Sequence, residues 1–100
     1  MKMELVFEWD SKKAEINRQK HSVSFEEAKT VFYHPLSKIF DDEIHSYKEK
    51  REIIIGYTSK ERLIIVIFTE RKQNTIRIIS ARPATKKERK DYEEKHNKKE

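Results

Sequence analysis

Residues 51–82 read REIIIGYTSKERLIIVIFTERKQNTIRIISAR, and this stretch decides the fold. Three runs rich in Ile and Val, at 51–58, 62–70 and 75–82, have the β-branched composition of strands. The connections between them are short enough for hairpin loops, so neighbouring strands are expected to be antiparallel. Residues 63–68 are apolar at every position, which predicts a central strand covered on both faces.

The N-terminal residues predict a strand followed by a helix. In residues 4–9, polar and apolar side chains alternate well enough for a short strand. Asp10 is a good N-cap for a helix over 11–20. That helix has only Ala14 and Ile16 as apolar residues, so its neighbours must hold it in place.

A stronger helix signal follows. Ser24 and Glu27 form a capping box, and Val23 is placed to staple over the first turn. Apolar residues at positions 25, 28, 31 and 32 predict one buried face. Pro35 ends this helix.

The remaining segments complete an α+β chain. We expect a short strand at 38–40, a polar loop at 41–50 and a last helix from the capping box of Thr85 and Glu88 to about residue 96. The order is then β-α-α-β-β-β-β-α. This predicts one domain over residues 1–100, with a helical pair on a mostly antiparallel sheet.

Composition narrows the class of protein. One hundred residues are too few for a two-domain enzyme with a separate cofactor domain, and 23 basic residues are largely offset by 18 acidic ones. The chain has no Cys, hence no disulfide, thiol nucleophile or Cys-rich zinc site. With no apolar span and no signal peptide, we expect a soluble cytoplasmic protein, and the pI near 9.4 favours an anionic partner.

Arginines gather around the last two predicted strands. Arg77 and Arg82 lie in or at the end of one strand, while Arg62, Glu70 and Arg71 flank the other. Arginines fixed on a sheet can hold a phosphate bidentately and stabilise its developing charge. The alternative is that strand-end arginines only keep the sheet edges soluble. Arg77 and Arg82 have opposite parity, so they share a face only across a bulge or past the strand end.

Lys20 and His21 stand where the first helix should end. The histidine can serve as a general acid or base near neutral pH, and the lysine beside it can hold an anion. The alternative is that both only complement the helix dipole. The other histidines lack metal-ligand spacing, and no nucleotide-binding or hydrolase motif occurs, so we expect neither a metal nor a cofactor.

Two ordered sets of residues resemble the BrnT family of bacterial type II toxins over about residues 7–94. The opening set is Phe7-Glu8-Trp9-Asp10, Lys13, Asn17, Lys20-His21 and residues 23–28, and the closing set is Thr69-Glu70-Arg71, residues 76–82, Glu88-Arg89 and Tyr92. The chain departs from the family at Ser22, where Gly is usual, and at Phe68, where many members have His. Ser would strain a turn that needs positive φ.

The resemblance implies a RelE-like fold and a metal-independent endoribonuclease that inhibits translation. Arg77 and Arg82 would then stabilise the phosphate, and His21 or Glu70 would transfer the proton. The supporting RNA contacts would be Lys20, Arg62, Arg71 and Tyr92.

The resemblance also implies a partner, a BrnA antitoxin with a ribbon-helix-helix domain. The complex would contact DNA only through the antitoxin. We expect a hetero-complex in which the antitoxin covers the second face of the sheet, because the first and last helices are too poor in apolar residues to do so. The competing hypothesis is a non-catalytic basic module that binds a protein or a nucleic acid.

Overall fold

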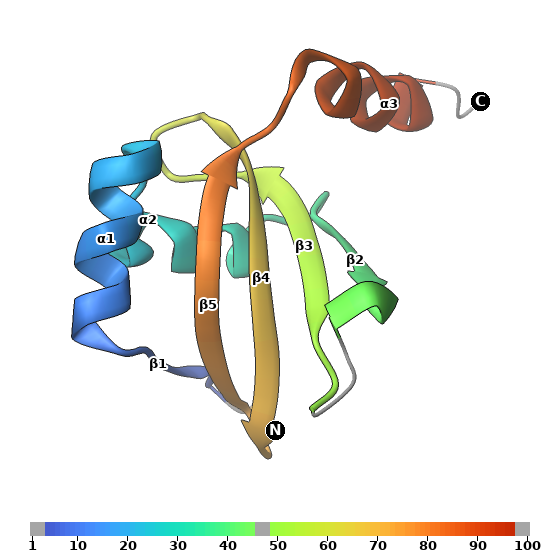
Figure 1. Ribbon diagram of the computed structural model, residues 1–100. Helices are drawn as coiled ribbons and strands as arrows, with labels where there is room; N and C mark the ends of the chain where they lie inside the picture. The colour runs from blue at the N-terminus through green and yellow to red at the C-terminus, as the bar shows by residue number, and fades with distance from the viewer. Residues whose placement is uncertain (1–3, 46–48, 98–100) are drawn as a thin grey trace.

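Five strands form one mixed sheet in the order β1-β5-β4-β3-β2 (Figure 1). The computed structural model describes residues 4–45 and 49–97. Its elements are β1 (Val6–Glu8), α1 (Ser11–His21), α2 (Phe25–Ala28), the 3-10 helix η1 (Lys29–Tyr33), β2 (Lys38–Asp41), the 3-10 helix η2 (Glu43–His45), β3 (Glu52–Tyr57), β4 (Leu63–Lys72), β5 (Thr75–Pro83) and α3 (Lys86–Asn97). The expected α+β order is confirmed.

Antiparallel pairing joins β2, β3, β4 and β5 through successive neighbours, whereas the short β1 runs parallel to β5. The strand predicted to be central, β4, is the middle strand of the sheet. Its side chains alternate between two packed faces, which explains why residues 63–68 are apolar at every position.

Helices α1 and α2 with η1 cover the first face, and Figure 1 shows α2 behind the strands. The core of this face is built from β-branched and aromatic side chains that are almost fully buried: Val23, Phe25, Ala28, Val31, Ile54, Ile64, Val66, Phe68, Ile76, Ile78 and Ala81. Phe32 packs edge-on against Phe68, with ring centroids 4.9 Å apart.

The second predicted helix is shorter than the sequence indicates. Its α-helical part ends at Ala28, and a 3-10 helix continues to Tyr33. Side-chain hydroxyls explain the change: Thr30 donates to the Glu27 carbonyl at 2.7 Å, and Ser37 donates to the Val31 carbonyl at 2.7 Å. Such side-chain bonds compete with the helical ladder for these carbonyls.

Helix α3 covers one end of the second face, so the expectation that the chain's helices leave this face bare is wrong there. Tyr92 packs with Ile55, Leu63 and Ile65, and its hydroxyl donates to the Leu36 carbonyl at 2.8 Å. One large aromatic residue thus compensates for an otherwise polar helix. None of the helices within residues 4–45 and 49–97 has the length and apolar character of a membrane span.

Candidate functional site

A β-bulge brings Arg77 and Arg82 to the same face of β5. Opposite β4, Ile67 pairs with Ser80 but Phe68 pairs with Ile78, so Ile79 is an extra residue. The neighbours Ile78 and Ala81 both point into the first-face core. Alternation on either side of the bulge therefore directs both arginines to the second face.

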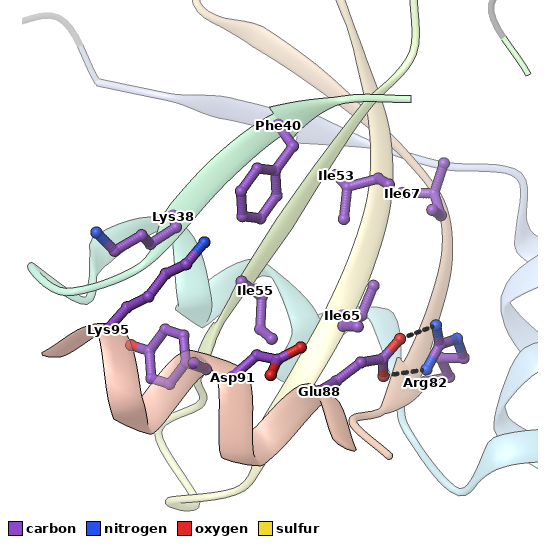
Figure 2. A pocket seen from close by; sticks show the side chains of 11 residues that line it. Lys38, Phe40, Ile53, Ile55, Ile65, Ile67, Arg82, Glu88, Asp91 and Lys95 are labelled. Carbon is purple, nitrogen blue, oxygen red and sulfur yellow. Dashed lines mark hydrogen bonds and ion pairs between the residues drawn. The ribbon is translucent and has the colours of Figure 1, made fainter. Parts of the chain in front are cut away.

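Arg82 is held by a bidentate ion pair at the end of β5. Its two terminal nitrogens donate to the two carboxylate oxygens of Glu88, each at 2.9 Å, as Figure 2 shows. Glu88 is also the capping residue of α3, because its Oε1 accepts from the Thr85 amide at 2.9 Å. The hydrogen bonds from Arg82 lower the pKa of Glu88 to about 2.

Arg77 has a looser partner from the neighbouring strand. Glu8 lies opposite Arg77 in the parallel register, and Arg77 Nη1 is 3.3 Å from Glu8 Oε2. Both side chains are about one-third exposed or more. The pair orients the guanidinium while leaving other N–H groups open to a ligand.

A second set of cations lines a cleft of about 200 Å³ between α1 and β5. Its lining residues are Lys13, Ile16, Asn17, Lys20, His21, Ile79 and Ser80. In the described part of the chain, none of its three basic side chains has an ion-pair partner. The cleft meets β5 at the bulge, so the predicted pair Lys20 and His21 lies beside the strand that holds both arginines.

Two features fix α1 against β5. The buried Asn17 amide donates to the Ala81 carbonyl at 2.8 Å and accepts from the Ala81 amide at 3.1 Å. Ser22 then ends the helix in the left-handed region, at φ 59°. The strain expected for Ser at this position is therefore present, at a cost of about 1 kcal/mol.

Arg62 forms an ion pair next to the C-terminal end of α1, the end that carries Lys20 and His21. Its guanidinium donates to Glu27 Oε2 at 2.9 Å and to Glu27 Oε1 at 2.5 Å. The Glu27 side chain is only 3% exposed, and Thr58 also donates to it at 2.7 Å. Hydrogen bonds from Arg62 lower the pKa of Glu27. Arg62 also donates to the Ser22 carbonyl at 2.9 Å, so it ties α1 and α2 to the β3–β4 turn.

The other predicted site residues are not brought to this cluster. Glu70 is exposed near the far end of β4 and, by alternation from Phe68, lies on the face opposite Arg77. Arg71 is at the same end, 4.0 Å from Glu49. Tyr92 is buried beneath α3.

Sequence reasoning did not include Lys13, Ser80, Glu8 or Glu88 among the site residues. Lys13 lies four and seven residues before Asn17 and Lys20, so helical periodicity could have placed it on the same face. From the sequence, Glu88 is predicted only as part of the capping box of the last helix. Its pairing with Arg82 depends on the turn between β5 and α3, for which the sequence has no signal.

No metal centre is apparent in the described ranges. Within residues 4–45 and 49–97, no group of three or more His, Asp or Glu side chains is arranged to hold a metal ion.

Comparison with known families decides the identity. Residues 9–88 match the model of BrnT, the ribonuclease toxin of type II toxin–antitoxin systems. The chain belongs to the BrnT family. A comparison of the BrnT chain with curated proteins finds no match.

A solved structure agrees with this assignment. The chain is similar to the crystal structure of the Brucella abortus ribonuclease toxin BrnT, with 25% identity and a TM-score of 0.62. The match covers 85% of this chain and 100% of the Brucella chain. The fold and the family inferred from the sequence motifs are therefore confirmed. As a member of a type II toxin family, the chain has an antitoxin as its expected partner.

Phe68 has a packing role in this fold. It is 3% exposed within the first-face core. A side chain at this position points away from Arg77 and Arg82, so it does not contribute to the surface that carries these arginines.

Proposed function

We propose that this chain is a metal-independent endoribonuclease that arrests translation in the cytoplasm by cleaving RNA across β5. The observation that carries the proposal is the bulge at Ile79, which directs Arg77 and Arg82 to one face. The cationic cleft of α1 opens beside the same bulge. An RNA backbone that crosses β5 at this point would pass both guanidinium groups and the lysine and histidine side chains of the adjacent cleft, so successive phosphates would meet basic side chains.

The chemistry follows from this arrangement. His21 accepts the proton of a ribose 2′-OH, and the oxygen attacks the adjacent phosphorus. Arg77 and Arg82 stabilise the extra negative charge of the phosphorane. The bond to the 5′-oxygen then breaks, and that oxygen takes up a proton. The products are a 2′,3′-cyclic phosphate and a 5′-hydroxyl end.

The remaining residues have supporting roles. Lys20 and Lys13 would bind flanking phosphates, since both line the cleft without ion-pair partners in the described part of the chain. Glu70, the second candidate for proton transfer, lies on the face of β4 opposite Arg77, so His21 is preferred for this role. Glu70 and Arg71 would contact a longer RNA. Arg62 and Tyr92 would act by positioning the elements that hold the site rather than by touching RNA.

The partner would be a BrnA-like antitoxin with a ribbon-helix-helix domain. In this arrangement the antitoxin makes the DNA contacts, and the toxin joins the DNA-bound assembly only through it. The toxin would be held for most of the time in this hetero-complex.

Purified toxin should degrade single-stranded RNA and leave DNA of the same sequence intact, with no effect of EDTA. The reason is that the attacking group is the 2′-OH, which DNA lacks. Gel analysis of labelled oligonucleotides measures this, with a substrate carrying a single 2′-O-methyl ribose at the cleavage position as the matched control. Loss of activity on chelation, or equal cleavage of DNA, would contradict the proposal.

A further inference from the structure

In the part of the chain that the structure describes, strand β2 leaves one backbone edge of the sheet unpaired. It is the last strand in the sheet order, with β3 as its neighbour. Just past the strand, the Asp42 amide donates to the Arg51 carbonyl at 2.9 Å. Hydrogen-bonded pairs alternate along an antiparallel ladder, so residues 38 and 40 also face β3. The N–H and C=O groups of Ile39 and Asp41 therefore point outward.

The same edge is apolar on both faces. Ile39 on one face is 54% exposed, and Phe40 on the other is 45% exposed. Leu36 before the strand and Ile44 after it are 52% and 81% exposed. Edge strands are usually protected by charges, bulges or a covering element, because a free edge pairs readily with another chain. Here the charged residues are only those at the two ends of the strand, Lys38 and Asp41.

A cavity of about 320 Å³ opens directly beside this edge, between β2 and α3. Its sheet side is formed by Phe40, Ile53, Ile55, Ile65 and Ile67, as Figure 2 shows. At the end near β2, Lys38 and Lys95 approach the rim. In the described part of the chain neither lysine has an ion-pair partner, in contrast to Arg77 and Arg82.

We propose that the outer edge of β2 binds an extended segment of the antitoxin as a sixth strand, with one large apolar side chain of that segment in the cavity under α3. Strand addition satisfies the outward groups of Ile39 and Asp41. A side chain on the second face of the added strand lies next to Phe40, where the cavity opens. An acidic residue of the segment pairs with Lys38 or Lys95. The inference rests on the proposed function only for the nature of the partner.

Charge and burial favour this edge over the arginines as the main contact. Arg62, Arg77 and Arg82 already have carboxylate partners within the chain, which an antitoxin would have to displace. The β2 edge has unsatisfied backbone groups, exposed apolar side chains and unpaired lysines together. The cavity extends from β2 to Arg82 and Glu88, so an antitoxin segment at β2 would reach the edge of the surface proposed for RNA, and the rest of the partner could cover β5.

Hydrogen exchange on the unmodified protein tests the backbone pairing. The probe is the antitoxin expected to be encoded beside the gene of a type II toxin, and amide exchange is compared for the toxin with and without it. The Ile39 and Asp41 amides should exchange at least tenfold more slowly in the complex. Amides in the middle of α1 are the internal control. Unchanged exchange at both residues would overturn the proposal.

Ile39→Pro tests the same point by mutation. Proline removes the outward N–H, and it is tolerated on edge strands where that group faces solvent. The matched control is Ser11→Pro, at the first position of α1, where proline is also tolerated. Ile39→Pro should bind the antitoxin about 100-fold more weakly and still cleave RNA, whereas Ser11→Pro should do both like the unmodified toxin.

A side-chain variant keeps the test valid if proline unfolds the strand. Phe40→Ala removes one wall of the cavity and should weaken antitoxin binding about tenfold. Unchanged affinity in both Ile39→Pro and Phe40→Ala would overturn the proposal. So would a toxin that is dimeric alone and becomes monomeric with Ile39→Pro, because the occupant would then be a second copy. Normal antitoxin binding by a toxin without RNA cleavage would instead contradict only the proposed function.

Discussion

The two faces of the sheet are built differently. The first face is closed by α1, α2 and η1, and its side chains from β4 and β5 are nearly all buried. The second face is covered at one end, where Tyr92 packs beneath α3, and a cavity remains beside that contact. Both arginines proposed to act on RNA lie on the second face. The first face therefore mainly stabilises the fold, and the surface proposed for ligands is the second face together with the cleft between α1 and β5.

Two bidentate ion pairs show the same difference between the faces. Arg62 holds Glu27 almost out of contact with solvent, at the point where the helices of the first face meet the β3–β4 turn. Arg82 and Glu88 form a similar bidentate pair, but both side chains are one-third exposed or more. The two arginine side chains are about equally exposed, at 40% and 41%, so the difference lies in their carboxylate partners. The buried Glu27 holds Arg62 in place, whereas the exposed Glu88 can give way to a phosphate at Arg82.

The largest expected difference between the faces is in the free energy of unfolding. Ile64 and Ile67 are on the same strand, but Ile64 is fully buried in the first face and Ile67 only lines the cavity of the second. Ile64→Ala should lower the free energy of unfolding by about 3–4 kcal/mol, and Ile67→Ala by about 1 kcal/mol. Chemical denaturation of both variants measures this. Equal losses would mean that the two faces contribute alike.

A smaller effect is expected in catalysis on the open face. Arg77→Lys and Arg82→Lys keep the charge but lose the planar fork, so RNA cleavage should fall about tenfold while the fold persists. Arg89→Lys is the control, because Arg89 lies on the exposed side of α3, with Glu93 at 3.7 Å. Cleavage rates and melting temperatures of the three variants are compared. The same loss of cleavage in all three variants would mean that the strand arginines contribute only to a general positive potential.

The smallest effect concerns acid stability. Glu88 has its pKa lowered to about 2 by Arg82, so its contribution to stability is present above about pH 4.5 and is lost as the pH falls toward 2. Glu88→Gln keeps the capping hydrogen bond but loses this contribution, about 1 kcal/mol at pH 7 after allowance for solvent exposure. The gap in melting temperature between the two proteins should close between pH 4.5 and 2. A gap that persists at pH 2 would show that the ion pair is not its source.

Local signals in the sequence predicted the elements well. The capping box at Thr85 and Glu88 forms as expected, with the Glu88 amide donating to Thr85 Oγ1 at 3.1 Å and the reciprocal bond at 2.9 Å. The box at Ser24 and Glu27 forms only by half. Ser24 accepts from the Glu27 amide at 3.0 Å, but the Glu27 carboxylate binds Arg62, which is far away in sequence. A capping pattern covers four neighbouring residues, so it does not reveal a distant side chain that competes for the same carboxylate.

Only part of the candidate site could be predicted from the sequence, again because its geometry depends on residues distant in the chain. The sequence identified Arg77 and Arg82 but predicted a common face only if a bulge intervened. Nothing in residues 77–82 marks Ile79 as the extra residue, because a bulge depends on the opposing strand. The position of Lys20 and His21 beside β5 also could not be predicted, because it depends on a tertiary contact. Asn17 makes this contact by hydrogen bonding to Ala81, 64 positions away.

Asn17 has a consequence for the solubility of the folded toxin. Strand β1 pairs with β5 only from Thr75 to Arg77. The edge of β5 beyond Arg77 would otherwise be open to pairing with a foreign chain. The Asn17 side chain supplies both a donor and an acceptor to Ala81, as a neighbouring peptide group would. One amide thereby satisfies the outward backbone groups of Ala81, with which a foreign strand would otherwise pair. It does so without adding a strand over the bulge, and the surface proposed to receive RNA stays uncovered.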